Sequence, residues 1–287
     1  DLHSFPTRRS SDLVVGKALE AGAKNLILGL GGSATNDGGC GAAAALGAVF
    51  LDEAGNSFVP TGATLKAIYR IDMDQLRRRL HGVTVTVMCD IDNPLCGENG
   101  AAAVFGPQKG ADAAMIHRLD DGLAHLAAVI RRDLDITIAD MPGAGAAGGM
   151  GAGAAAFFGG SLRRGIDVVL DTVSFEERAA GADMVFTGEG RFDAQSLMGK
   201  AVGGVARRAK TVHLPVTVVA GSIADDVDEE AVREAGIGAF FSINQAPLSF
   251  SEAAPRSREN LCRTMKNLLR LWEMARMMQL PDRKSVV

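Results

Sequence analysis

Aromatic residues are scarce in this chain. They make up 5% of its 287 residues, with a single Trp and a single Tyr, whereas glycine occurs 35 times. Such a composition is typical of helices that pack closely on sheets rather than of an all-β fold. We therefore expect an α/β protein, and its length suits one large domain or two of ordinary size.

The chain also lacks an excess of positive charge and any long apolar run. Its formal net charge is -4, which argues against nucleic-acid binding through a basic surface. No apolar stretch approaches the length of a membrane span, and no secretory signal is recognisable. We expect a cytoplasmic protein whose partner is a small molecule, with no nucleic acid and no membrane among its partners.

Cysteine is infrequent, and its spacing indicates neither a disulfide framework nor a zinc site. The four cysteines are Cys40, Cys89, Cys96 and Cys262. None forms a C-x-x-C pair, and none has zinc-ligand spacing with the five histidines. We expect free, mostly buried thiols in a reducing compartment.

The two ends of the chain differ from the rest. The first thirteen residues contain no methionine and no periodic pattern. Residues 5–13 (FPTRRSSDL) look like one reading frame of a common sequencing adaptor, and residues 282–287 (DRKSVV) look like a frame of its reverse complement. We expect residues 1–13 and 282–287 to be adaptor-derived and not native, the alternative being natural polar and basic tails.

A glycine-rich stretch from Leu26 to Gly47 predicts a strand, a loop and a helix. An apolar run ends at Gly31-Gly32, small polar residues follow, and an alanine-rich segment begins after Gly38-Gly39. Glycines let backbone N–H groups turn towards a ligand, and a helix N-terminus adds unpaired donors, so this loop suits an anion. The structural alternative is that Asn36 or Asp37 caps the helix. Spacing alone leaves both interpretations open.

Acidic residues follow a second predicted strand. Residues 83–88 alternate apolar and β-branched side chains as a strand does, and Asp90, Asp92 and Asn93 come directly after them. Ligands of open α/β sheets bind at the carboxyl ends of strands, and carboxylate and amide oxygens are good ligands for hard cations. A turn closed by hydrogen bonds from these side chains before Pro94 explains the pattern equally well.

A third glycine-rich segment favours a different class of protein. Residues 143–148 read GAGAAG, a G-x-G-x-x-G pattern that follows a strand-like stretch at 136–139, with Asp171 at about the spacing of a ribose-binding acid. The pattern predicts an NAD-dependent oxidoreductase. Pro142 and further glycines up to Gly153 argue against it, since they leave too little uninterrupted helix for the usual βαβ unit.

From residue 166 onward, strand and helix patterns alternate, which predicts a parallel sheet covered on both faces. We expect strands at 166–170, 184–187, 215–220 and 239–243. The polar segment TGEGRFDAQSLMGK, residues 187–200, leaves one of these strands and enters a helix. Its spacing is not that of a Walker A loop. An ordinary polar loop remains the structural alternative.

Taken together, five blocks of the sequence resemble the bacterial glycerate kinase family. They are GGSATNDGG after residue 30, CDIDNPLCGENGAAAVFGPQKGA from Cys89, PGAGAAGGMGAG from Pro142, DMVFTGEGRFDAQSLMGKA from Asp183 and VVAGSI from Val218. They occur in the family's order, and the resemblance covers about residues 14–280. It implies an ATP- and Mg²⁺-dependent kinase that phosphorylates D-glycerate and releases ADP, with 2-phosphoglycerate as the favoured product.

The resemblance also implies the domain arrangement. We expect residues 14–180 to form a middle, mixed α/β domain. Residues 181–281 are then the C-terminal part of a flavodoxin-like or Rossmann-like nucleotide-binding domain whose parallel sheet is incomplete here, with the active site in the cleft between the domains. PDSFKG-like and ADGGEGT-like segments typical of the family's N-terminal part are missing from the sequence, so an inactive fragment of a kinase is a further alternative. A homo-oligomer is compatible with the sequence.

Phosphoryl transfer requires a metal ion, cationic or N–H donors, and a group that accepts the hydroxyl proton. We expect Asp193 to be the base and Lys200 or Arg191 to offset the transferred charge. The candidates for Mg²⁺ are Asp90, Asp92 and Glu189. The candidates for binding the substrate or a phosphate group are Gly31, Gly32, Ser33, Asn36, Asp37, Gly38 and Lys109.

Overall fold

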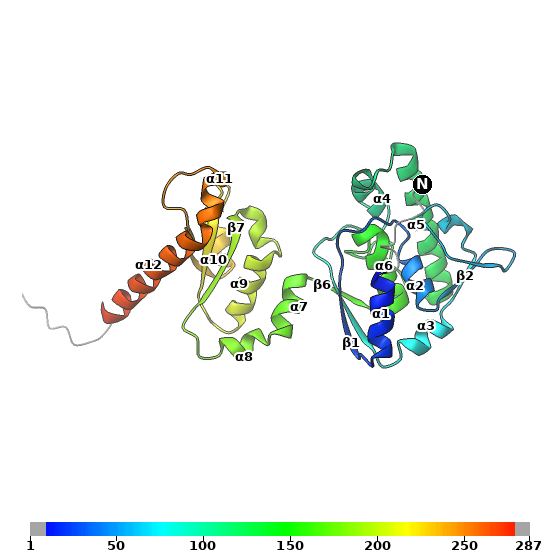
Figure 1. Cartoon of the computed structure of the whole chain (residues 1–287), viewed down its shortest axis with the longest axis horizontal. Coiled ribbons are helices and arrows are strands. Elements are labelled where there is room, and N and C mark those ends of the chain that lie inside the picture. The colour runs from blue at the N-terminus through cyan, green and yellow to red at the C-terminus, as the bar shows by residue number, and fades with distance from the viewer. Residues whose placement is uncertain (1–9, 279–287) are drawn as a thin grey trace, which may run out of the picture. The chain divides into compact units, whose positions relative to one another are not determined.

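The computed structural model describes residues 10–278 and divides into two compact units, one ending at Val168 and the other beginning at Val169 (Figure 1). From the sequence, the domain boundary is expected between residues 180 and 181. In the structure, residues 169–180 belong to the second unit instead of the first. Each unit has its own hydrophobic core, and each is described below by itself.

A three-stranded parallel sheet lies at the centre of the first unit. Its strands are β1 (Asn25–Gly29), β5 (Thr84–Met88) and β6 (Ser161–Arg163), in the order β1-β5-β6. Val85 and Val87 of the middle strand are buried, with Thr86 between them only partly so. The strands expected near residues 26–30 and 83–88 are confirmed.

A second, antiparallel sheet of the first unit has the order β3-β2-β4. Its strands are β2 (Val49–Leu51), β3 (Ser57–Phe58) and β4 (Arg70–Asp72). Asp52 closes the β2–β3 turn, since its Oδ1 accepts the N–H of Asn56 at 2.8 Å. A turn of this type fixes the register of the hairpin.

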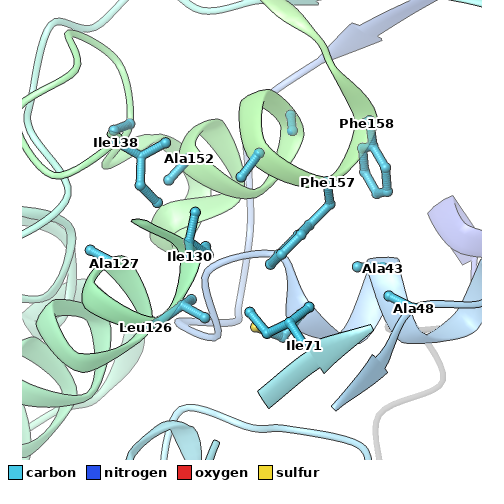
Figure 2. Close-up of a cluster of buried hydrophobic side chains, with 14 of the residues drawn as sticks. Ala43, Ala48, Ile71, Leu126, Ala127, Ile130, Ile138, Ala152, Phe157 and Phe158 are labelled. Atoms are coloured by element: carbon cyan, nitrogen blue, oxygen red, sulfur yellow. The ribbon is translucent and has the colours of Figure 1, made fainter. Parts of the chain in front are cut away.

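Helices enclose the core of the first unit. They are α1 (Ser10–Glu20), α2 (Cys40–Ala45), α3 (Asp74–Arg79), α4 (Ala101–Phe105), α5 (Ala113–Leu134) and α6 (Ala146–Phe158), with short 3-10 turns η2 (Leu65–Ala67) and η3 (Pro107–Lys109). Asp112 caps α5, because its Oδ1 accepts the N–H of Met115 at 2.7 Å. Figure 2 shows Leu126 and Ile130 of α5 near Phe157 of α6, and Phe157 meets Phe50 edge to face.

The second unit contains another parallel sheet, in the order β7-β8-β9. Its strands are β7 (Val185–Phe192), β8 (Val216–Ile223) and β9 (Ile237–Ser242), and its helices are α8 (Phe175–Ala179), α9 (Ala201–Thr211), α10 (Glu229–Glu234), α11 (Phe250–Ala253) and α12 (Ser257–Met278), with 3-10 turns η4 (Ala194–Leu197) and η5 (Ala254–Arg256). Helices alternate with these strands along the chain. The expected α/β class with two α/β units is thus confirmed.

Two details of the predicted strands are wrong. Residues 166–170 belong to helix α7 (Gly165–Thr172), whereas the preceding Ser161–Arg163 forms the strand β6. A five-residue apolar run does not distinguish helix from strand. Strand β7 also extends beyond the predicted end at residue 187 and continues to Phe192. Gly188 allows this, because it has no side chain and its backbone can approach the carbonyl oxygen of Val219, which would lie 2.1 Å from a Cβ at that position.

None of the helices in residues 10–278 has the combination of length and low charge that a membrane crossing demands. The longest, α5 and α12, carry charged side chains along their length.

Candidate functional site

The loops of the first unit that carry the candidate residues leave one edge of a sheet. Because β1, β5 and β6 are parallel, the segments that follow them start at the same, carboxyl edge. The Leu30 N–H still donates to the Met88 carbonyl at 3.2 Å, so the loop after β1 begins beside the end of β5. The glycine-rich loop and the acidic segment are therefore neighbours.

Side chains of the loop after β1 bond to the loop's own backbone. The N–H of Thr35 donates to Ser33 Oγ at 3.2 Å. Asp37 receives two N–H groups at the start of α2, from Gly39 on Oδ1 at 3.1 Å and from Gly41 on Oδ2 at 3.2 Å. The structure thus gives Asp37 the capping contacts that the structural alternative requires.

Asn36 differs from its neighbours. It is only 9% exposed, and neither Nδ2 nor Oδ1 of its carboxamide has a hydrogen-bond partner among the described residues. Burying an amide without partners is unfavourable, so such a group demands an explanation. A ligand that supplies a donor and an acceptor is one.

Lys109 reaches the same loop from η3. Its Nζ donates to the Thr35 carbonyl oxygen at 2.7 Å. The ammonium group is half-buried, and this desolvation lowers its pKa, while the nearby Asp37 carboxylate opposes the shift. Lys109, one of the candidates for binding the substrate, therefore lies beside the glycine-rich loop.

The glycines of residues 143–153 pack against this loop. The Gly38 N–H donates to the Gly148 carbonyl at 3.1 Å, and a Cβ at Gly148 would lie 1.9 Å from the Thr35 carbonyl oxygen. Gly143, Gly145 and Gly148 are all buried. Their small size serves backbone contact within the unit.

Within the described residues, the structure lacks the strand and the free ribose-binding acid that a dinucleotide-binding motif at residues 143–148 requires. Residues 136–139 are not a strand, and Asp171 lies on helix α7, where its carboxylate pairs with Arg208 at 2.6 Å. Helix α6 does form, but it is interrupted near its start, in line with the argument from glycine content. Residues 147–149 have left-handed backbone angles, and the helix continues from there to Phe158 despite two further glycines.

The acidic segment after β5 bonds mainly to the segment after β6. Asp90 Oδ1 accepts the N–H of Gly165 at 2.8 Å, and Asp92 Oδ2 lies 3.7 Å from the guanidinium of Arg164. Asn93 Nδ2 donates to the Asn99 carbonyl at 2.9 Å. Asp90 and Asp92 are both exposed, so oxygen atoms of both remain accessible to a cation.

In the second unit, Glu189 and Arg191 are strand residues of β7 rather than loop residues. Arg191 is exposed, whereas Oε1 of Glu189 is buried and has no hydrogen-bond partner in the described part of the chain. A buried carboxylate oxygen without a donor is costly. It fits a cation or a donor supplied by a ligand.

Asp193 forms a capping box at η4. Its Oδ1 accepts from the backbone N–H and from Oγ of Ser196, both at 3.1 Å, while Ser196 Oγ accepts the Asp193 N–H at 3.0 Å. Lys200 Nζ lies 3.9 Å from the same carboxylate oxygen and 3.4 Å from Gln195 Oε1. The polar loop after β7 is therefore ordered by its own side chains.

The glycerate kinase family model matches residues 9–273. The chain is 46% identical over 269 residues to glycerate kinase of Bacillus cereus, an alignment that covers 94% of this chain and 70% of that protein. It is also 46% identical over 262 residues to glycerate 2-kinase of Escherichia coli, covering 91% of this chain and 68% of that protein. This chain belongs to the glycerate kinase family.

A solved structure agrees with that assignment. The crystal structure of a Salmonella typhimurium LT2 protein assigned as glycerate kinase 2 matches with a TM-score of 0.79 and 42% identity, covering 93% of this chain and 69% of that one. Because the members of this family are kinases, the chain is an enzyme of the kinase class.

The candidate residues of this family member fall into two groups. Asp90, Asp92 and all the substrate candidates, Lys109 included, lie in the first unit, whereas Glu189, Arg191, Asp193 and Lys200 lie in the second. No three His, Cys, Asp or Glu side chains of residues 10–278 converge as a metal site.

Some residues that shape these groups were missed in the sequence. Gly148, Gly165 and the Thr35 carbonyl contact predicted site residues directly. The density of glycine between residues 143 and 153 was the available signal for Gly148. No local signal marks a backbone carbonyl that bonds to a lysine 74 residues away.

Proposed function

We propose that the chain transfers the γ-phosphoryl group of ATP to D-glycerate, producing ADP and phosphoglycerate, with 2-phosphoglycerate favoured. The family assignment and the relative named glycerate 2-kinase support the substrate. The observation that carries the site is the buried carboxamide of Asn36, which has no partner among the described residues and belongs to the residue after Thr35, whose carbonyl Lys109 contacts. The free thiols of residues 10–278 fit a cytoplasmic location.

The loop after β1 is the proposed binding site for the acid. Gly31 and Gly32 are exposed, so their N–H groups can donate to a carboxylate. Lys109 has donors beyond the one given to Thr35, and Ser33 and Asn36 add side-chain groups. Asp37 and Gly38, both engaged with backbone, hold the loop in shape.

Mg²⁺ is the proposed metal, since it prefers oxygen ligands. The orphaned Oε1 of Glu189 in the second unit fits such an ion, and so do the exposed carboxylates of Asp90 and Asp92 in the first. Each of these two groups would hold an ion within its own unit. Bound Mg²⁺ neutralises phosphate charge during transfer.

Asp193 is the proposed acceptor of the hydroxyl proton. Its Oδ1 accepts hydrogen bonds from the backbone N–H and the hydroxyl group of Ser196, and these bonds orient the carboxylate. Lys200, close to the same carboxylate, and the exposed Arg191 would offset the charge of the transferred group.

The test is ADP formation that requires D-glycerate, ATP and Mg²⁺ together, with the product identified by ³¹P NMR as 2- or 3-phosphoglycerate. We expect ATP–Mg²⁺ to raise the melting temperature and NAD to leave it unchanged. Turnover without D-glycerate, or stabilisation by NAD alone, would contradict the proposal.

The roles of two carboxylates are tested separately. Asp193→Asn removes the proposed base and should reduce kcat by about 10²-fold or more. Asp37→Asn weakens the cap on the acid-binding loop and should raise KM for D-glycerate. Near-normal kcat in Asp193→Asn would contradict its role as base, and an unchanged KM for D-glycerate in Asp37→Asn would contradict its role in the acid-binding loop.

A further inference from the structure

The backbone of Thr35–Gly38 is held by two residues that are remote in sequence. Lys109 Nζ donates to the Thr35 carbonyl, and the Gly148 carbonyl accepts the Gly38 N–H. Gly148 has φ +72°, and a Cβ there would collide with the Thr35 carbonyl oxygen. Only glycine permits this approach. These contacts of Lys109 and Gly148 with Thr35–Gly38 are called the loop clamp below.

Asn36 lies within the clamped segment. Its carboxamide offers two N–H donors and one acceptor, and neither Nδ2 nor Oδ1 is satisfied by any residue that the structure describes. A fully ionised phosphoryl group supplies acceptors only. A hydroxy acid supplies both kinds of partner, because its oxygen atoms accept hydrogen bonds and its hydroxyl donates one.

The start of the loop is open. Gly31 and Gly32 are exposed, and no other atom lies within 4 Å of a Cβ built at either residue. At Gly38, by contrast, a Cβ would lie 2.3 Å from the side chain of Leu126. A small ligand thus has room at the start of the loop and meets fixed backbone at its end.

We propose that the loop clamp holds the Asn36 carboxamide so that it recognises a hydroxyl group of the bound hydroxy acid. Asn36 is then a specificity-determining residue, and Lys109 and Gly148 are positioning residues that act through the loop. This inference rests on the proposed function, in which the hydroxy acid is D-glycerate.

The clamp is tested first by amide hydrogen exchange of residues 33–39 in the unliganded chain. Lys109→Met and Gly148→Ala should each speed exchange there by about tenfold, because each releases the backbone. Lys109→Arg keeps a donor and should restore much of the protection. Exchange unchanged in both clamp variants would overturn the clamp.

Matched controls separate the clamp from general loss of stability. Lys66→Met removes an exposed lysine that pairs with Asp121. Gly159→Ala places a side chain at a glycine with φ +60° and nothing within 4 Å of the new Cβ. Both controls should leave exchange of residues 33–39 unchanged.

Specificity is tested by calorimetric binding of D-glycerate, of 3-hydroxypropionate, which lacks the 2-hydroxyl, and of D-lactate, which lacks the 3-hydroxyl. Asn36→Ala should reduce the preference for D-glycerate over one of these analogues by about tenfold, since one hydrogen bond is lost. Lys109→Met should weaken D-glycerate binding and reduce the same preference. Asn56→Ala, in the exposed β2–β3 turn, is the control.

The outcomes distinguish this inference from the proposed function. If Asn36→Ala binds D-glycerate with an unchanged preference over both analogues, the specificity role is wrong while the kinase proposal stands. If the unmodified chain neither binds D-glycerate nor forms ADP with it, the proposed function fails and the specificity role fails with it. The exchange data decide the clamp in either case.

Discussion

Glu189 has one carboxylate oxygen, Oε1, that is buried and has no hydrogen-bond donor among the residues that the structure describes. Its neighbours Gly188 and Gly190 on β7 add no side chains around it. Burying an unpaired charge costs more free energy than burying an unpaired amide. The buried carboxamide of Asn36 in the first unit is therefore the less unfavourable of the two groups. A ligand that supplies the missing hydrogen-bond partners or a cation would account for both groups.

At Glu189 the prediction is a gain of stability together with a loss of binding. Glu189→Gln removes the uncompensated charge, so the free energy of unfolding should stay constant or rise by about 1 kcal/mol. Stabilisation by ATP–Mg²⁺ should disappear in a thermal melt. Glu273→Gln, at an exposed position of α12, is the control. A clear loss of stability in Glu189→Gln alone would show that the carboxylate has a partner in the protein.

At the scale of elements, Arg208 of α9 connects three helices of the chain. Its guanidinium donates to both carboxylate oxygens of Glu176 in α8 and to Asp171 in α7 at 2.6 Å. These carboxylates raise the pKa of Arg208 above its ordinary value. Planar, two-pronged pairing of this type is specific to arginine.

Replacing Arg208 should therefore loosen the helices before β7. We expect Arg208→Ala to lower the melting temperature by several degrees, and Arg208→Lys to recover only part of the loss because lysine lacks the fork. Arg233→Ala, which removes an exposed pair with Glu230, should have little effect. Equal melting temperatures for Arg208→Ala and Arg233→Ala would contradict the prediction.

Asp133 joins the end of α5 to β4. Burial opposes its ionisation, but hydrogen bonds from Arg132 and from the Ile71 N–H at 2.9 Å outweigh this effect and lower its pKa. A lowered folded-state pKa contributes stability that is present above the unfolded-state value of about 3.9 and is lost as pH falls through the folded value.

Asp133→Asn should consequently reduce the free energy of unfolding by about 1–2 kcal/mol at pH 7. The difference from the unmodified chain should begin to shrink below about pH 4, where the carboxylate of the unfolded chain becomes protonated, and should vanish as pH falls through the lower folded-state pKa. Urea denaturation between pH 3 and pH 7 measures both. Asp135→Asn, at an exposed left-handed position that asparagine tolerates, is the control. A pH-independent difference would show that charge is not the cause.

At the scale of the whole molecule, the chain has two cores that share no residue. Phe157 meets Phe50 in the first, and Phe192 meets Phe240 in the second. Damage to one core should therefore stay in its own unit.

Truncating one aromatic residue in each core tests this independence. Phe157→Ala should cost about 3–5 kcal/mol and speed amide exchange in β1 and β5, leaving β7 and β8 protected. Phe192→Ala should show the reverse pattern. Loss of protection in all four strands from either substitution would mean that the units unfold as one.

The sequence predicts elements better than contacts. Val83–Met88 alternates so regularly that strand β5 could be predicted from it, and Asp112 marks the start of α5. The strand predicted from the IDVVL run at 166–170 was wrong because a five-residue apolar run does not distinguish helix from strand. The bond from Lys109 to Thr35 joins distant segments through the folded chain, so no local pattern announces it.

Gly148 of the loop clamp limits which substitutions this part of the chain can accept during evolution. Every single-nucleotide change that alters a glycine codon introduces a larger residue or a stop. At Gly148 even one added methyl group collides with the neighbouring peptide. If this loop binds the acid as we propose, adaptation to a different acid would proceed through Asn36 and the open start of the loop, since Gly148 behind them tolerates no added side chain.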